Sequence, residues 1–383
     1  MRRFCTPGGL RFLTLRSWTG IACVLIASSL SLRAQLWVNG GGAGNVKWSR
    51  TDNWAPNGAP ANDGSANLVF GPVAKPQGYA PDMDANWNVN SVTFASSNTN
   101  SYALHSLSGF TLTLQGGITN NSTLVQTVSN SIVLGANQTW NAAAGDLAIA
   151  GNVDNNGHAL SVGGAHDTTF TGIISGSGGL TKNDSGMLSL LANDTFSGPV
   201  TINGGTLNAG AAGALGSVSS VTINGGSLSL AGLGNRVNDF APILLNGGGI
   251  WGNNLSEAFG PLTVSASSSI NLSPGGAAGT ITFASAQWTA GTLTINGWSG
   301  AAHTAGTDDR VLVSIRPADN FLANVQFAGF PMGSEYLLSG ELVPVPEPKP
   351  MLLCFCTFAL ASLRYLNRVR KRASARRLLD FEA

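Results

Sequence analysis

Charged side chains are scarce in this chain of 383 residues, because Lys, Arg, Asp and Glu together make up only 10% of it. A typical soluble protein has about 25%. Long helices place such side chains at their exposed positions, so the scarcity argues against a helical protein. Intrinsic disorder fits poorly as well, since 43% of the residues are hydrophobic and the net charge is only +1, whereas disordered chains combine low hydrophobicity with high net charge.

Cysteine is absent between Cys23 and Cys354. The body of the chain, residues 35–340, therefore has no disulfide framework, no cysteine-based zinc site and no cysteine nucleophile. This body carries seven Lys and Arg against fifteen Asp and Glu, a net charge of −8. We expect no nucleic-acid partner, because binding phosphates requires clustered positive charge.

Signatures of catalysis and metal binding are also missing from the sequence. The four histidines show no metal-ligand spacing: they are His105, His158, His166 and His303. The triplet Asp308-Asp309-Arg310 alternates between the two faces of a strand, so it cannot form a carboxylate pair without a bulge. Asp82 and Asp84 have better spacing but no partner base nearby. We therefore predict no catalytic residue, no metal site and no cofactor.

The N-terminus has the composition of a secretory signal peptide. Basic residues precede an apolar run over residues 21–30, and Leu32-Arg33-Ala34 follows before Gln35. A basic region, an apolar region and a small residue at the cleavage site define such a peptide. We expect the export machinery to take up residues 1–34 and signal peptidase to cut between Ala34 and Gln35. An uncleaved anchor is the alternative, although ten apolar residues are too few to cross a bilayer.

The C-terminus contains three features in a fixed order. The motif Val345-Pro346-Glu347-Pro348 lies in a Pro-rich linker over residues 341–350, a hydrophobic helix is predicted over residues 351–366, and a basic tail over residues 367–383 ends the chain. Positive charge stays on the cytoplasmic side of a membrane, so the body would lie outside. The residues of this basic stop signal are Arg364, Arg368, Arg370, Lys371 and Arg372.

This order resembles the PEP-CTERM sorting signal of exopolysaccharide-producing Gram-negative bacteria, over residues 345–372. The resemblance implies that a membrane-embedded exosortase recognises Pro346, Glu347 and Pro348 and removes the helix with its basic end. The protein would be anchored transiently in the inner membrane and then displayed on the outer surface or in the extracellular matrix. An ordinary, permanent C-terminal anchor is the alternative.

A short phrase recurs within the body. The sequence Val-Thr-Ile-Asn-Gly-Gly begins at Val200 and again at Val221, and a related phrase begins at Ile243. Alternating apolar residues predict a short strand, and Asn-Gly-Gly predicts a turn with positive φ angles. The turn residues are Asn203, Gly204, Gly205, Asn224, Gly225, Gly226, Asn246 and Gly247.

A period near 21 residues predicts an all-β fold, a right-handed parallel β-helix over residues 35–340, with the clearest repeat at 172–250. At about 21 residues per coil the body would hold about 14 coils. The recurring asparagines could stack as an amide ladder along the coils. A β-sandwich is the competing fold, but its strands do not repeat one phrase.

Residues 172–207 resemble the autotransporter-associated β-strand repeat. The residues that carry the resemblance are Gly178-Gly179-Leu180-Thr181-Lys182, then Gly186-Met187-Leu188-Ser189-Leu190, then Phe196-Ser197-Gly198 and the phrase from Val200 to Leu207. The resemblance implies a long secreted protein of repetitive β-structure.

Four tryptophans cluster near the start of the body: Trp37, Trp48, Trp54 and Trp87. We expect them to close the open end of the β-helix, which otherwise exposes strand edges to water. A sugar-stacking surface is the alternative.

These observations together predict an exported, non-enzymatic β-helical protein with a structural or adhesive role, in contact with extracellular polysaccharide. A polysaccharide-active β-helical lyase or hydrolase is one alternative, and a permanently anchored adhesin is another.

Overall fold

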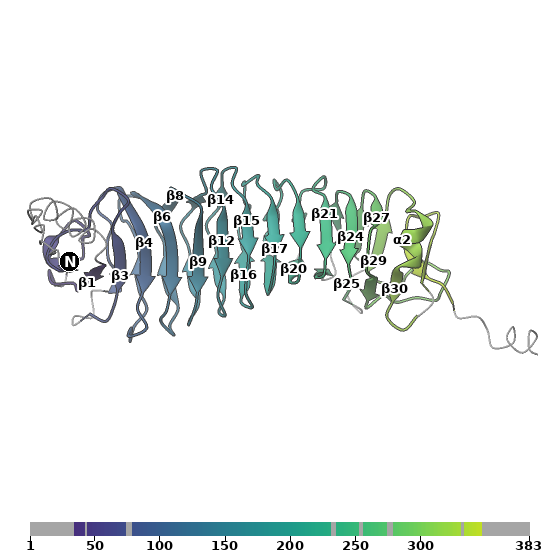
Figure 1. The fold of residues 1–383 in the computed structure, drawn as a ribbon, viewed down its shortest axis with the longest axis horizontal. Helices are drawn as coiled ribbons and strands as arrows, with labels where there is room; N and C mark the ends of the chain where they lie inside the picture. Colours follow the sequence, from purple (N-terminus) through teal and green to yellow (C-terminus); the bar gives the residue numbers. More distant parts are fainter. Residues whose placement is uncertain are drawn as a thin grey trace, which may run out of the picture.

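The fold is an all-β parallel solenoid, seen in a computed structural model that describes residues 34–42, 44–73, 79–230, 235–252, 256–273, 279–330 and 333–346. Figure 1 shows strands stacked side by side along one elongated body, from the N-terminal end in purple to the C-terminal end in yellow-green. The predicted parallel β-helix is thereby confirmed, and its right-handed winding stays a prediction. Residues 1–33 of the predicted signal peptide and the predicted hydrophobic helix over residues 351–366 lie outside the described residues.

Two long sheets form most of the solenoid, and a third, short sheet lies near the C-terminal end. The first sheet comprises β1 (Gln35–Trp37), β2 (Trp54–Ala55), β3 (Asn67–Phe70), β4 (Trp87–Phe94), β6 (Thr111–Asn120), β8 (Ser131–Leu134), β9 (Gln138–Ala142), β11 (Val153–Asp154), β12 (Leu160–Gly163), β14 (Ile174–Ser175), β15 (Leu180–Lys182), β17 (Val200–Ile202), β19 (Val221–Ile223), β21 (Ile243–Asn246), β24 (Leu262–Ala266) and β27 (Ala286–Trp288).

The second sheet comprises β5 (Ala103–Leu104), β7 (Gln126–Val128), β10 (Leu147–Ile149), β13 (Thr168–Phe170), β16 (Met187–Leu190), β18 (Thr206–Ala209), β20 (Ser227–Leu230), β22 (Gly249–Gly252), β25 (Ser268–Asn271), β28 (Leu293–Asn296) and β30 (Val325–Phe327). The third comprises β23 (Glu257–Phe259), β26 (Thr280–Phe283) and β29 (Arg310–Val313). The remaining elements are the 3-10 helix η1 (Thr51–Asn53), the helix α2 (Asp319–Ala323) and the hairpin strands β31 (Ser334–Tyr336) and β32 (Leu342–Pro344).

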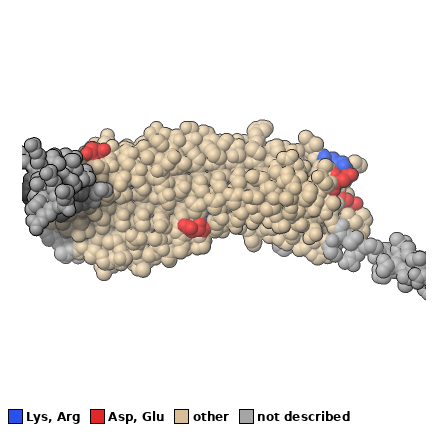
Figure 2. Space-filling view, in the orientation of Figure 1, with Lys and Arg blue, Asp and Glu red and all other residues tan. Residues whose placement is uncertain are grey.

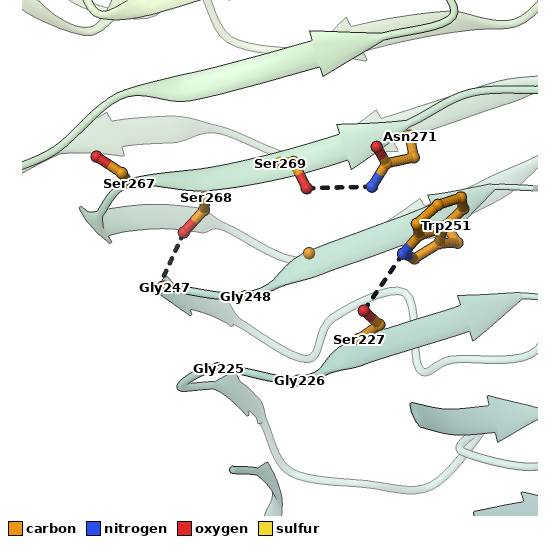
Figure 3. Close-up of a pocket in the computed structure, with 11 residues that line it drawn as sticks. Gly225, Gly226, Ser227, Gly247, Gly248, Trp251, Ser267, Ser268, Ser269 and Asn271 are labelled. Atoms are coloured by element: carbon orange, nitrogen blue, oxygen red, sulfur yellow. Dashed lines mark hydrogen bonds between the residues drawn. The ribbon is translucent and has the colours of Figure 1, made fainter. Parts of the chain in front are cut away.

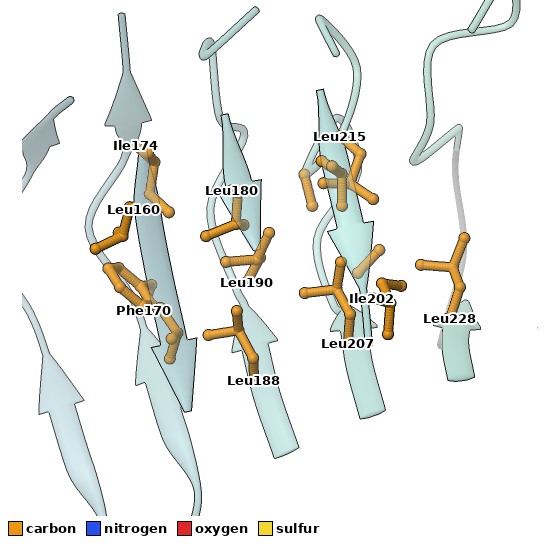
Figure 4. Close-up of a cluster of buried hydrophobic side chains, with 14 of the residues drawn as sticks. Leu160, Phe170, Ile174, Leu180, Leu188, Leu190, Ile202, Leu207, Leu215 and Leu228 are labelled. Atoms are coloured by element: carbon orange, nitrogen blue, oxygen red, sulfur yellow. The ribbon is translucent and has the colours of Figure 1, made fainter. Parts of the chain in front are cut away.

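The repeated phrase sets the register between coils. Val200 pairs with Val221, and Val221 pairs with Ile243, so equivalent apolar residues lie directly above one another. In the second sheet Leu207 and Leu228 form the same kind of column. All five side chains are buried. Figure 4 shows Leu207 and Leu228 in the cluster of apolar side chains inside the coils. Because successive side chains in a strand point to opposite faces, the residues between them face outward.

The solenoid has fewer coils than the sequence predicted. The second sheet has 11 strands and the main path of the first sheet has 12 parallel strands, where about 14 coils were expected from a constant length of about 21 residues. Central coils do keep that length, since Leu160 pairs with Leu180 and Leu180 with Val200. Coils near the ends are longer, since Leu293 pairs with Val325. The coils at the ends contain longer connections, so the same number of residues forms fewer coils than a constant length of about 21 residues predicts.

The predicted asparagine ladder is present along the turns. Asn224 Nδ2 donates to Asn203 Oδ1 over 2.8 Å, and Asn246 Nδ2 donates to Asn224 Oδ1 over 3.1 Å. The ladder begins one coil earlier than predicted, because Asn203 Nδ2 also donates to Asn183 Oδ1 over 2.8 Å. Each amide thus uses its donor toward one coil and its acceptor toward the next, which ties the turns together.

Removing Asn224 should weaken the solenoid measurably. Asn224→Ala deletes two ladder bonds, each worth about 1 kcal/mol, so we expect urea unfolding to show a loss of about 1–2 kcal/mol. Thr222→Ala is the control, because Thr222 lies in the same parallel strand, half-buried on its outward face, and should change stability by about 0.5 kcal/mol or less. Equal unfolding midpoints for the two variants would show that the ladder contributes nothing.

The turn glycines have two different roles. Positive φ angles occur at Gly205 (+60°) and Gly247 (+112°) as predicted, but Gly204, Gly225 and Gly226 do not adopt them. Gly226 is needed for another reason: a Cβ there would lie 2.7 Å from Ile202 Cγ2 and 2.8 Å from the carbonyl oxygen of Gly205. The prediction of positive φ is therefore wrong for the second turn, where close stacking of the coils requires glycine.

The tryptophan cluster closes the N-terminal end, as predicted. Trp37, Trp48 and Trp54 are fully buried and Trp87 nearly so. Trp37 and Trp54 pack edge to face with ring centroids 5.1 Å apart. The short strand β2 pairs antiparallel with β1 and ends the first sheet. With their rings buried against one another, these four residues are excluded as a sugar-stacking surface.

The C-terminal end is closed by α2 and the hairpin of β31 and β32. Leu342 and Val343 are fully buried, and the backbone N–H of Val345 donates to the carbonyl of Gly333. The folded body therefore extends beyond Gly340, where the sequence placed its boundary, and the first residues of the predicted linker belong to this closing hairpin. The hairpin also lies against β29, because Leu312 and Glu341 form an antiparallel bridge and the backbone N–H of Val313 donates to the Gly340 carbonyl.

Candidate interaction surface

Most acidic side chains of the body accept hydrogen bonds from backbone N–H groups. Asp194 and Glu257 are buried, and their carboxylates accept hydrogen bonds from backbone N–H groups one coil away. Asp194 Oδ1 accepts from Ile174 N over 2.7 Å, and Glu257 Oε1 accepts from Val237 N over 2.8 Å. Burial raises the pKa of each carboxyl to about 7, because removal from water penalises the charged form. These acids hold coils together and face no open site.

The acidic candidates from the sequence have structural partners too. Asp82 accepts from Leu107 N over 3.1 Å, and Asp84 accepts from Ser49 Oγ over 2.5 Å. Asp309 is buried and accepts from Gly279 N over 2.6 Å, whereas the neighbouring Asp308 accepts from Ser299 Oγ over 2.8 Å. Each carboxylate therefore already has a hydrogen-bond partner within the fold. Asp82 and Asp84 are half-buried on either side of the buried Met83, whereas Asp309 is buried and its neighbour Asp308 is not.

The histidines lie in separate places. His166 lies 3.9 Å from an Asp146 carboxylate oxygen, and His303 contacts Glu335 in β31 of the closing hairpin. Within the described ranges, no group of three His, Cys, Asp or Glu side chains could hold a metal ion.

Lys182 is a buried cation that sequence reasoning left without a role. Its side chain is 2% exposed, and the ammonium donates to the carbonyl oxygens of Asn183, Asp184 and Gly204, the last in the next coil. Burial lowers the pKa of this lysine. Lys182, the lysine of the Gly-Gly-Leu-x-Lys motif, therefore connects two consecutive turns through hydrogen bonds to their carbonyl oxygens.

The outer face of the solenoid is largely uncharged. Figure 2 shows charged side chains in a few small places on the visible face, with a broad continuous area of other residues between them. The outward rows of the second sheet consist mainly of small, uncharged residues. One such row runs through Thr206, Ser227, Gly249, Ser269 and Thr294.

A second row interrupts this pattern with an aromatic side chain. It runs through Ser229, Trp251 and Asn271, and Trp251 is 48% exposed. The indole lies beside a groove of about 420 Å³ that is lined by five glycines, four serines, Trp251 and Asn271 (Figure 3). We call it the Trp251 groove. Trp251 Nε1 donates to Ser227 Oγ over 3.3 Å at its edge.

Sequence reasoning missed Trp251 although a signal was present. Ile250 occupies the position of Leu228, one coil later. Because Leu228 points inward, the residue after Ile250 has to point outward. The same register therefore places the Trp251 side chain on the outer face, beside the serines of the neighbouring coils.

The predicted processing residues lie at the limits of the described chain. Ala34 is exposed, and Gln35 is the first residue of β1. Val345 and Pro346 follow the closing hairpin, whereas Glu347, Pro348 and the basic stop signal, Arg364, Arg368, Arg370, Lys371 and Arg372, lie outside the described residues. In the part of the chain that the structure describes, no helix has the length and apolar character needed to span a membrane.

Comparison with known proteins supports the repeat. Residues 180–209 match the family described as passenger-associated-transport-repeat. The adhesin BmaC autotransporter of Brucella suis biovar 1 (strain 1330) is 34% identical over 125 residues, which cover 31% of this chain and only 3% of that adhesin. No solved structure matches the chain. The expected resemblance to an autotransporter-associated repeat is therefore confirmed for one part of the solenoid, and the PEP-CTERM signal stays a prediction.

Proposed function

We propose that this protein is an exported, non-enzymatic, adhesin-like solenoid that acts at the cell surface or in the extracellular polysaccharide of a Gram-negative bacterium. The observation that carries the proposal is the passenger-type repeat at residues 180–209, which lies within a continuous parallel solenoid. The similarity to an autotransporter adhesin supports the same class of role. A solenoid of this kind offers a long surface for contact.

The proposal includes two processing steps. Signal peptidase cuts between Ala34 and Gln35, and an exosortase-like membrane protease acts at Val345-Pro346-Glu347-Pro348 and removes the hydrophobic helix with its basic tail. The positions of these sites support the steps, because Gln35 begins β1 and Val345 directly follows β32. Both cuts would leave every described strand intact.

The enzymatic alternative requires two acids, or an acid and a base, that converge on one exposed face. Asp194 and Glu257 are instead buried against backbone N–H groups. The structural use of these carboxylates and the adhesin relative favour the non-enzymatic role.

Intact-mass spectrometry of protein recovered from the extracellular material tests the proposal. The expected mass is that of a chain that begins at Gln35 and ends at or near Val345-Pro346-Glu347-Pro348, without the hydrophobic helix and the basic tail. A chain that keeps its C-terminal helix on the cell would support the permanently anchored adhesin instead. Recovery of the uncut chain from the cytoplasm would contradict the proposal.

A further inference from the structure

We propose that the Trp251 groove binds a segment of neutral polysaccharide, with one sugar ring packed against the indole of Trp251. The inference rests on the proposed function, because it names the site through which the displayed solenoid contacts extracellular polysaccharide. It begins from one observation: the large aromatic side chain of Trp251 is 48% exposed among outward residues that are Ser, Thr, Asn or Gly in the neighbouring coils.

The chemistry of the groove fits a sugar. A pyranose ring has an apolar C–H face and a rim of hydroxyl groups, and it therefore needs an aromatic surface beside several hydrogen-bonding groups. Ser227 Oγ accepts the indole N–H, and Ser269 Oγ accepts from Asn271 Nδ2 over 3.1 Å. Each serine hydroxyl thus keeps its proton for donation to a ligand.

The lining selects against charged ligands. All eleven lining residues are Gly, Ser, Asn or Trp. An anionic polymer would lose water from its carboxylates or phosphates there and gain no cation in return, which is unfavourable. A neutral glycan has no such penalty, so the groove is suited to hydroxyl-rich, uncharged polymers.

The hollow is a fixed part of the stacked coils. Gly249 lies between Ser227 and Ser269 in the outward row, and the missing side chain opens the space beside Trp251. On the floor of the groove, a Cβ at Gly248 would lie 2.3 Å from the Gly226 carbonyl oxygen, so the stacking itself requires glycine there. The bond to Ser227 also holds the indole in place. A site that is formed before binding loses little entropy when the ligand arrives.

Affinity electrophoresis of the purified exported protein tests this inference. The gels contain dextran, hydroxyethylcellulose or galactomannan as neutral polymers, or alginate as an anionic one. We expect at least one neutral polymer to retard the wild type and alginate to have no effect. Trp251→Ala should weaken the interaction by about fivefold or more, equivalent to about 1 kcal/mol. Gly249→Ser places a side chain in the space beside Trp251 and should weaken the interaction as well.

The matched control is Phe240→Ala, because Phe240 is 86% exposed and does not line the groove. It should bind as the wild type does. If Trp251→Ala binds as strongly as the wild type, the inference fails while a polysaccharide-binding adhesin stands. If no neutral polymer retards the wild type, or only alginate does, the inference also fails, and export and processing are then judged separately by the intact mass.

Discussion

Replacement of Gly205 by alanine is expected to destabilise the solenoid by about 3 kcal/mol or more. Gly205 has a φ of +60°, which costs a residue with a Cβ about 1–2 kcal/mol. The added Cβ would also lie 2.4 Å from the Gly186 carbonyl oxygen and 2.8 Å from Lys182 Nζ. Relief of these contacts would pull the turn away from the buried lysine that fastens it. Urea unfolding followed by circular dichroism measures the loss.

Gly225→Ala is the matched control for Gly205→Ala. Gly225 belongs to the equivalent turn one coil later, has no positive φ, and a Cβ there would meet only the Asn203 carbonyl oxygen at 3.1 Å. We expect a change of less than about 1 kcal/mol, in the range of ordinary surface substitutions. If Gly205→Ala and Gly225→Ala lowered the free energy of unfolding by the same amount, the positive φ and the close contact with the Gly186 carbonyl oxygen would not explain the need for glycine at position 205.

The solenoid is expected to become more stable as the pH falls from 8 to 5. Asp194 and Glu257 have ordinary pKa values of 3.8 and 4.5, and burial raises both to about 7 in the folded chain. The folded state therefore binds more protons between these limits, so the free energy of unfolding rises as the pH falls through 7 and levels off near the ordinary values. At about 1.4 kcal/mol per pKa unit, the gain amounts to a few kcal/mol.

The double variant Asp194→Asn, Glu257→Gln tests the source of this dependence. Both amides keep an oxygen that can accept the backbone N–H bonds, but neither titrates. The variant should lose most of the pH dependence between 5 and 8 and exceed the wild type in stability at pH 8. Asp319→Asn is the control, since the Asp319 side chain is 86% exposed and pairs with Arg316 on the surface. A double variant with the wild-type pH slope would assign the dependence to other groups.

The repeated phrase was enough to predict the central coils. Val200, Val221 and Ile243 recur at nearly constant spacing, and only parallel stacking places them in one column. The ladder through Asn203, Asn224 and Asn246 followed from the same alignment. Periodicity thus fixed both the fold class and a set of side-chain contacts, because each coil repeats the environment of the previous one.

The roles of Gly226 and Lys182 could not be predicted, because they depend on distances between atoms of neighbouring coils. The role of Gly226 follows from the approach of Ile202, and the burial of Lys182 follows from carbonyl oxygens of two different turns. The ends of the solenoid were predicted least well, since their longer connections carry no repeat. The Trp251 groove depends on the register of three coils. This register turns Trp251 outward and places Gly249, which has no side chain, between Ser227 and Ser269.

The central claim is that the folded solenoid is displayed outside the cell. Because the body contains no cysteine, a single introduced thiol can be labelled on intact cells with a membrane-impermeant maleimide. Phe240→Cys places a thiol at a position that is 86% exposed, whereas Ala209→Cys places one in the fully buried core. The account predicts that Phe240→Cys is labelled on intact cells and Ala209→Cys only after denaturation. Labelling of Phe240→Cys that appears only after cell lysis would contradict it.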